Sequence, residues 1–126
     1  MSASPLLPSS NARAALAARF GLPYSGDMQD WEWEVADASR FHEFLDAYGE
    51  RDLTDAERFS LMEVLVQCVD DVGNTPKFRA YWNALKPLLQ ARLDLHRSTV
   101  EYWACLDEED PSSRFAVSTP MRDLLG

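Results

Sequence analysis

The sequence predicts an all-α fold, a compact single-domain helical bundle of about five to six helices with at most one tiny β-ribbon. Three observations predict it: apolar residues recur at helical spacing, capping residues precede these stretches, and glycine or proline follows them. A chain of 126 residues is close to the usual domain size and can bury a core without metal or disulfides. We expect a flexible N-terminal leader over residues 1–10 and one helical domain over residues 11–126.

The first expected helix begins after a capping serine, Ser9 or Ser10, and runs to about Phe20 through an alanine-rich stretch. Gly21 supplies a stop, and Pro23 prevents the helix from resuming.

Residues 31–35 (WEWEV) alternate between apolar and acidic side chains. A period of two is typical of a strand, although five residues suit an extended loop equally well. Residues 115–117 (FAV) are a candidate partner for a short ribbon.

The next two expected helices have clear starting signals. Asp37 caps a helix over residues 38–48, and Gly49 is the residue expected to follow its end. Thr54 and Glu57 form a capping box for a helix that reaches about Val72. Apolar residues cover more than one face of this second helix, so we expect it to be central.

Two helices are expected over residues 76–85 and 87–106, because Pro87 removes a donor and clashes with the preceding turn. An acidic turn over residues 108–113 and a short helix beginning at Thr119-Pro120 complete the chain. The convergent apolar stripes predict a core that includes Leu61, Leu65, Cys68, Val69, Trp82, Leu85, Leu89 and Trp103.

Charge is the strongest functional signal. The net charge is −9, and the segment from Asp27 to Asp71 holds fourteen acidic residues against three arginines. This field repels nucleic acid and anionic membranes and attracts basic proteins. The alternative is that the acidic residues only keep the protein soluble.

Other sequence features indicate a cytoplasmic protein. The first residues have no secretory signal, and no apolar stretch approaches the length of a membrane span. Cys68 and Cys105 both lie in apolar helical patterns and are expected to be reduced rather than disulfide-bonded or catalytic.

No pattern predicts catalysis, a cofactor or a metal site. His42 and His96 lie far apart, outside any metal-binding spacing, and are interpreted as structural. The sequence has no nucleophile motif and only five glycines, which leaves no phosphate-binding loop. We therefore expect a binding protein, not an enzyme.

The candidate partner-binding residues lie in the acidic segment: Trp31, Glu32, Trp33, Glu34, Asp70 and Asp71. Tryptophans beside carboxylates suit a basic or apolar partner surface, and the alternative is that they cover the core as a lid. Asp70 and Asp71 end a helix where its dipole disfavours negative charge. They indicate either a basic partner or an internal arginine.

Several stretches also carry a family resemblance: residues 27–37, 40–41, 53–62, 101–103 and 118–122, together with Phe115. They resemble small proteobacterial proteins of unknown function, some of which look like immunity proteins of bacterial toxin systems. The resemblance implies binding, not catalysis, and assigns no functional residue.

Two hypotheses follow. The first is a small immunity-type inhibitor that binds a basic toxin or effector through the acidic segment. The second is a regulatory or adaptor subunit, homodimeric through helices joined across an apolar patch.

Overall fold

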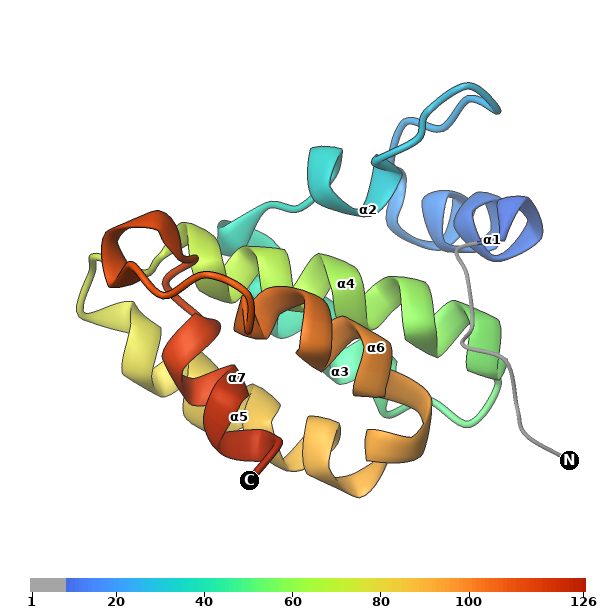
Figure 1. The fold of residues 1–126 in the computed structure, drawn as a ribbon. Coiled ribbons are helices and arrows are strands. Elements are labelled where there is room, and N and C mark those ends of the chain that lie inside the picture. Colours follow the sequence, from blue (N-terminus) through green and yellow to red (C-terminus); the bar gives the residue numbers. More distant parts are fainter. Residues whose placement is uncertain (1–8) are drawn as a thin grey trace, which may run out of the picture. The chain divides into compact units, whose positions relative to one another are not determined.

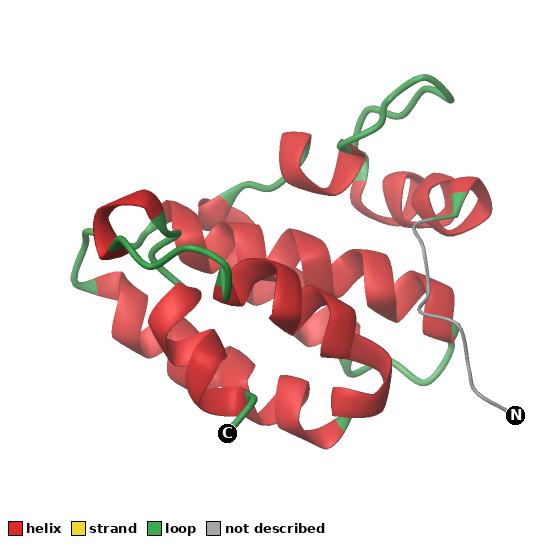
Figure 2. Cartoon of the chain, in the orientation of Figure 1, coloured by secondary structure: helices red, strands yellow, loops and turns green. Residues whose placement is uncertain are grey.

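A computed structural model describes residues 9–126 of the chain, and all regular secondary structure within this range is helical (Figures 1 and 2). Seven α-helices and two short 3₁₀-helices are found there, and no strand. The predicted all-α fold class is confirmed. The predicted leader falls mostly on residues 1–8, which lie outside the described residues.

The chain divides into two compact units, with the boundary inside the long helix α4 between Cys68 and Val69. The first unit contains α1 (Ser10–Phe20), α2 (Trp31–Glu34), η1 (Ala38–Arg40), α3 (Phe41–Tyr48) and most of α4 (Asp55–Asp71). The second contains the end of α4, α5 (Lys77–Ala91), α6 (Leu93–Ala104), η2 (Pro111–Ser113) and α7 (Ser118–Leu124). The single domain expected from the sequence remains a prediction.

Helix α1 has the expected ends. The Ser9 hydroxyl accepts a hydrogen bond from the Ala12 amide at 3.0 Å, which satisfies one of the free donors of the first turn. Gly21 adopts a left-handed conformation with φ 66°, a backbone region that glycine enters without steric cost. The predicted start at Ser9 and the predicted stop at Gly21 are therefore confirmed.

The predicted strand at residues 31–35 is wrong, because this segment forms the single helical turn α2. The amides of Trp33 and Glu34 both donate to the Asp30 carbonyl at 3.0 Å, and Val35 donates to the Trp31 carbonyl. One helical turn brings Trp31 and Val35 to the same side, and both are buried. Five alternating residues were too few to distinguish the strand period from the helical period. The suggested partner, residues 115–117, is not a strand either.

Asp37 caps the next helix as predicted, since its carboxylate accepts from the Ser39 amide at 3.0 Å. The helix begins as the 3₁₀ turn η1 and continues as α3, which buries Phe41 and Phe44. Gly49 follows the end of the helix as predicted, in a right-handed conformation. Its φ is −78°, and its amide donates to the Asp46 carbonyl in a right-handed last turn.

The capping box at the start of α4 is confirmed in both directions. The Thr54 amide donates to the Glu57 carboxylate at 2.8 Å, and the Glu57 amide donates to the Thr54 hydroxyl at 3.1 Å. Two backbone donors are thus satisfied where the helix begins.

Replacing Thr54 with alanine is expected to lower the free energy of unfolding by about 1 kcal/mol, because the Glu57 amide loses its acceptor. Urea denaturation of both proteins measures this difference. Thr54→Ser is the matched control, since it keeps the hydroxyl and should stay close to the parent. An unchanged midpoint for Thr54→Ala would show that the capping box adds nothing to stability.

Helix α5 does not end at Pro87 as predicted but continues to Ala91, and the break comes at Arg92. Leu85 and Leu89, on either side of the proline, are both fully buried, while Pro87 itself is exposed. Continuing the helix keeps both leucines in the core, and this burial offsets the hydrogen bond that the proline removes.

The predicted core is confirmed. All eight core residues named from the sequence are buried. In the second unit α6 and α7 pack together (Figure 1), and the Ser118 hydroxyl donates to the Trp103 carbonyl at 2.7 Å. Among the described residues, none of the helices is both long and apolar enough to cross a membrane.

Candidate functional site

Two of the residues predicted to bind a partner hold the first unit together instead. Trp31 is 0% exposed, and its indole nitrogen donates to the Pro23 carbonyl at 2.7 Å. Glu32 is also buried, and its two carboxylate oxygens accept from the Arg13 guanidinium at 2.7 and 2.8 Å. Trp31 therefore acts as the lid that the alternative interpretation described.

The other two residues of α2 reach the surface. Trp33 is half-buried, and its indole nitrogen donates to the Glu63 carboxylate at 3.3 Å. Glu34 is exposed, and its carboxylate has no hydrogen bond or ion pair within residues 9–126. Of this acidic-aromatic run, the first unit thus exposes Glu34 and part of Trp33 to solvent.

Asp70 and Asp71 belong to the second unit, where they differ from each other. The Asp70 carboxylate accepts from the Val117 amide at 3.2 Å, whereas Asp71 is exposed. Burial raises the pKa of Asp70, although hydrogen bonds from the Val117 and Ala116 amides oppose this increase. The internal partner of Asp70 is therefore backbone, not the arginine that the sequence suggested.

The segment before α7 lies close against the end of α4. A Cβ added to Gly73 would lie 2.2 Å from the Ala116 Cβ and 3.0 Å from the Asp70 carbonyl oxygen, so only glycine fits without a shift. Together with the Asp70–Val117 hydrogen bond, this close approach fixes the position of Phe115.

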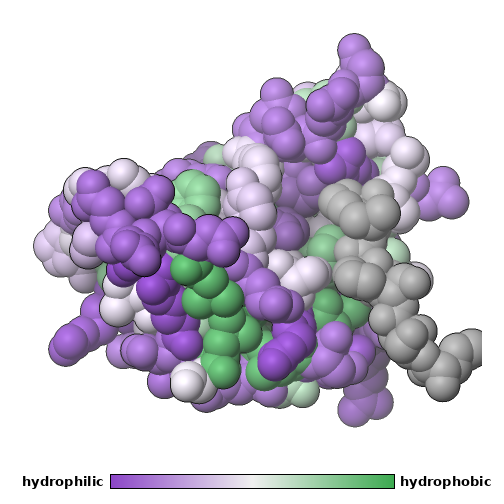
Figure 3. All heavy atoms as spheres, in the orientation of Figure 1, coloured by the Kyte–Doolittle hydropathy of each residue, from purple (hydrophilic) through white to green (hydrophobic). Residues whose placement is uncertain are grey.

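The second unit exposes three bulky apolar residues, Tyr102, Leu106 and Phe115, which we refer to together as the apolar patch. Their exposed fractions are 51%, 54% and 37%, the largest among the bulky apolar residues described. The Phe115 ring stacks on Tyr102 with centroids 6.0 Å apart and contacts the buried Trp103 at 4.5 Å. Figure 3 shows hydrophobic surface bordered by hydrophilic surface in the α6–α7 region of this unit.

Three acidic residues lie close in sequence to Tyr102 and Leu106, and we call them the acidic rim: Glu101, Asp107 and Glu109. Residues 101–110 contain five acidic side chains and no basic one. The carboxylates of the rim have no hydrogen bond or ion pair in the described part of the chain. Unpaired carboxylates beside exposed aromatic groups are available to cations of a partner.

Two arginines approach this acidic turn without neutralising it through ion pairs. Arg114 donates to the backbone carbonyls of Glu108 and Glu109 at 2.7 and 2.9 Å. Arg122 donates to the carbonyls of Ala104, Cys105 and Glu108. Both guanidinium groups bind the backbone of the turn, and neither forms an ion pair with a carboxylate of the rim.

The remaining candidate groups show no constellation for chemistry. His96 is buried and His42 is exposed, and both cysteines are free thiols. Within residues 9–126 no three His, Cys, Asp or Glu side chains are placed to hold a metal ion.

Comparison with protein-family models, with curated proteins and with solved structures finds no match for this chain. The candidate site therefore depends on the chain's own geometry. Sequence reasoning recognised the acidic turn and Phe115 separately and missed the patch. The sequence analysis noted the run Glu101-Tyr102-Trp103, but nothing in that run indicates contact with Phe115. The folded segment before α7 brings Phe115 onto Tyr102.

The raised pKa of Asp70 predicts a particular pH dependence. Between the ordinary aspartate pKa, about 3.9, and the higher folded-state pKa, the folded protein holds more protons than the unfolded chain. This group therefore makes stability fall as pH rises through that window. Asp70→Asn removes the titration and keeps an acceptor for the Val117 amide.

We expect the free energy of unfolding of Asp70→Asn, relative to that of the parent, to increase as pH rises from 3. The increase should be complete about two pH units or more above the aspartate pKa, near neutrality. Urea denaturation of both proteins across this range measures the difference. A difference independent of pH would contradict the raised pKa.

Proposed function

We propose that this chain is a non-enzymatic protein-binding domain whose partner is a basic protein. The carrying observation is that the exposed apolar patch lies in the same unit as three carboxylates that have no partner within residues 9–126. Exposed aromatic groups supply buried area in a complex, and the surrounding acidic groups select basic surfaces.

The two parts of the surface have different roles in binding. The acidic rim attracts a basic partner over distance and raises the association rate, and added salt screens this effect. Tyr102, Leu106 and Phe115 lose water-exposed apolar area on contact, which slows dissociation. The segment that holds Phe115 is fixed by Asp70 and Gly73, so little ordering is needed when a partner binds.

The resemblance to immunity proteins supports a specific form of this proposal, an inhibitor of a basic bacterial toxin or effector in the cytoplasm. The net charge of −9 supports a basic partner and works against nucleic acids and anionic membranes as ligands.

Selection from a random-peptide library displayed on phage tests the proposal. The immobilised full chain should enrich peptides that combine lysine or arginine with apolar residues. A patch variant carrying Tyr102→Ser and Leu106→Ser should lose most of this binding, because both side chains are more than half exposed and contribute to the contact. Acidic enriched peptides, or equal binding to the patch variant, would contradict the proposal.

A further inference from the structure

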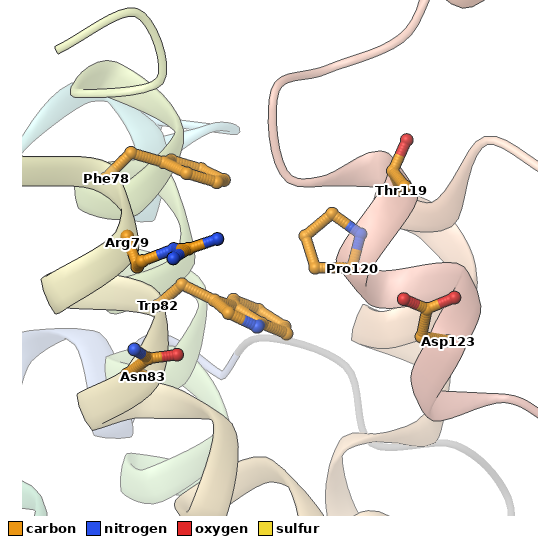
Figure 4. Close-up of a pocket in the computed structure, with 7 residues that line it drawn as sticks. All are labelled: Phe78, Arg79, Trp82, Asn83, Thr119, Pro120 and Asp123. Atoms are coloured by element: carbon orange, nitrogen blue, oxygen red, sulfur yellow. The ribbon is translucent and has the colours of Figure 1, made fainter. Parts of the chain in front are cut away.

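A separate groove runs between α5 and α7 in the second unit, with a volume of about 440 Å³ (Figure 4). Side chains from α5 and α7 line it: Phe78, Arg79, Trp82, Asn83, Thr119, Pro120 and Asp123. The two aromatic rings extend from α5 towards Pro120 on the opposite wall. Phe78, Trp82 and Pro120 form the apolar part of the lining, and the other four residues are polar or charged.

The walls carry opposite charges. Arg79 projects from α5 and Asp123 from α7, and both are exposed. Neither side chain has a hydrogen bond or ion pair within the described range 9–126. One cation and one anion thus face the groove from opposite sides, and each is available to an external charge.

From this arrangement we infer that the groove binds a second copy of the same chain. A two-fold interface requires one surface that carries both members of each contact, because residue i of one copy meets residue j of the other and the reverse. This groove meets that requirement. With α7 of each copy lying in the groove of the other, Arg79 faces Asp123 of the second copy, and the contact occurs twice.

The spacing of the lining residues fits such helix packing. Arg79 and Asn83 lie four residues apart on α5, and Thr119 and Asp123 lie four apart on α7. Residues at this spacing form ridges that pack into the grooves of a facing helix.

The second unit carries only a small part of the chain's net negative charge, so electrostatic repulsion opposes its self-association only weakly. Residues 69–126 contain nine acidic and seven basic residues, whereas residues 1–68 contain twelve and five. Repulsion between two copies is therefore weakest where the second unit supplies the contact.

Sedimentation velocity of the full chain over a range of concentrations tests the inference by charge exchange. The parent should dimerise reversibly at high concentration. Arg79→Glu and Asp123→Arg should each weaken dimerisation roughly tenfold or more, because each places like charges opposite one another twice. The double variant restores both attractions and should recover the parent's dimerisation. Arg97→Glu, an exposed charge reversal on α6, is the control and should change dimerisation little.

A parent that stays monomeric would overturn the inference, as would a double variant that fails to recover. Dimerisation unaffected by either single change would place the interface elsewhere and would equally overturn it. Peptide binding at the apolar patch is measured independently, so its loss would reject the proposed function without bearing on this groove.

Discussion

Replacing Glu32 with alanine is expected to lower the free energy of unfolding by about 3 kcal/mol, because it leaves a mostly buried guanidinium without its counter-charge. The exposed fractions of the Arg13 and Glu32 side chains are 13% and 4%. The hydrogen bonds that Arg13 donates to Glu32 raise the pKa of Arg13, so the arginine keeps its charge. We expect a loss near the low end for buried pairs, because Arg13 retains the Met28 and Gln29 carbonyls.

Urea denaturation of the parent and Glu32→Ala measures this loss. Glu43→Ala is the matched control, since it breaks the exposed pair with Arg40 and should change stability little. Removing both Arg13 and Glu32 should cost less than the sum of the two single losses, since no unpaired charge remains. A loss for Glu32→Ala no larger than for Glu43→Ala would contradict the structural role of Glu32.

Gly73→Ala is expected to destabilise the second unit by about 1–3 kcal/mol through overpacking. The added Cβ would lie 2.2 Å from the Ala116 Cβ, so the segment that carries Phe115 must move. The cost comes from this contact and not from the backbone conformation. In an open position the same substitution often stabilises a protein, because it restricts the unfolded chain.

Thermal denaturation with two further variants isolates the contact. Gly49→Ala is the matched control, because its nearest neighbour would be a carbonyl oxygen at an ordinary 3.6 Å. Adding Ala116→Gly to Gly73→Ala should recover part of the loss, although the Asp70 carbonyl at 3.0 Å remains close. Equal effects at Gly73 and Gly49 would show that the close approach does not constrain the fold.

Features set by local chemistry were predictable from the sequence. The cap at Ser9 and the box at Thr54 and Glu57 involve residues three apart, and the structure shows the expected hydrogen bonds. Local rules failed where packing decided. Pro87 lies within a helix because leucines on both sides of it are buried. The segment predicted as a strand forms the helical turn α2 because such a turn buries Trp31 and Val35 together.

The candidate site was less predictable because its parts are distant in sequence. Glu32 lies in a sequence context typical of a docking site, but it is buried in an ion pair with Arg13, which is nineteen positions away. Asp70 is joined to an amide forty-seven positions away, which no helical pattern indicates. Phe115 reaches Tyr102 only through that connection. The acidic charge was correctly noticed, but the sequence could not show which carboxylates remain unpaired.

Binding kinetics with matched charge variants test the central proposal most directly. The rim variant carries Glu101→Gln, Asp107→Asn and Glu109→Gln. The control variant carries Glu34→Gln, Asp46→Asn and Glu50→Gln, three exposed acidic residues of the first unit. Both variants change the net charge equally, so only the position of the charge differs.

Surface plasmon resonance measures a selected basic peptide against the parent and both variants at low and high salt. The proposal predicts that the rim variant slows association more than the control variant does, and that this difference shrinks as salt shortens the Debye length below about 8 Å. Leu106→Ala should mainly speed dissociation. Equal slowing by the two variants, or association indifferent to salt, would contradict a docking site at the apolar patch and its acidic rim.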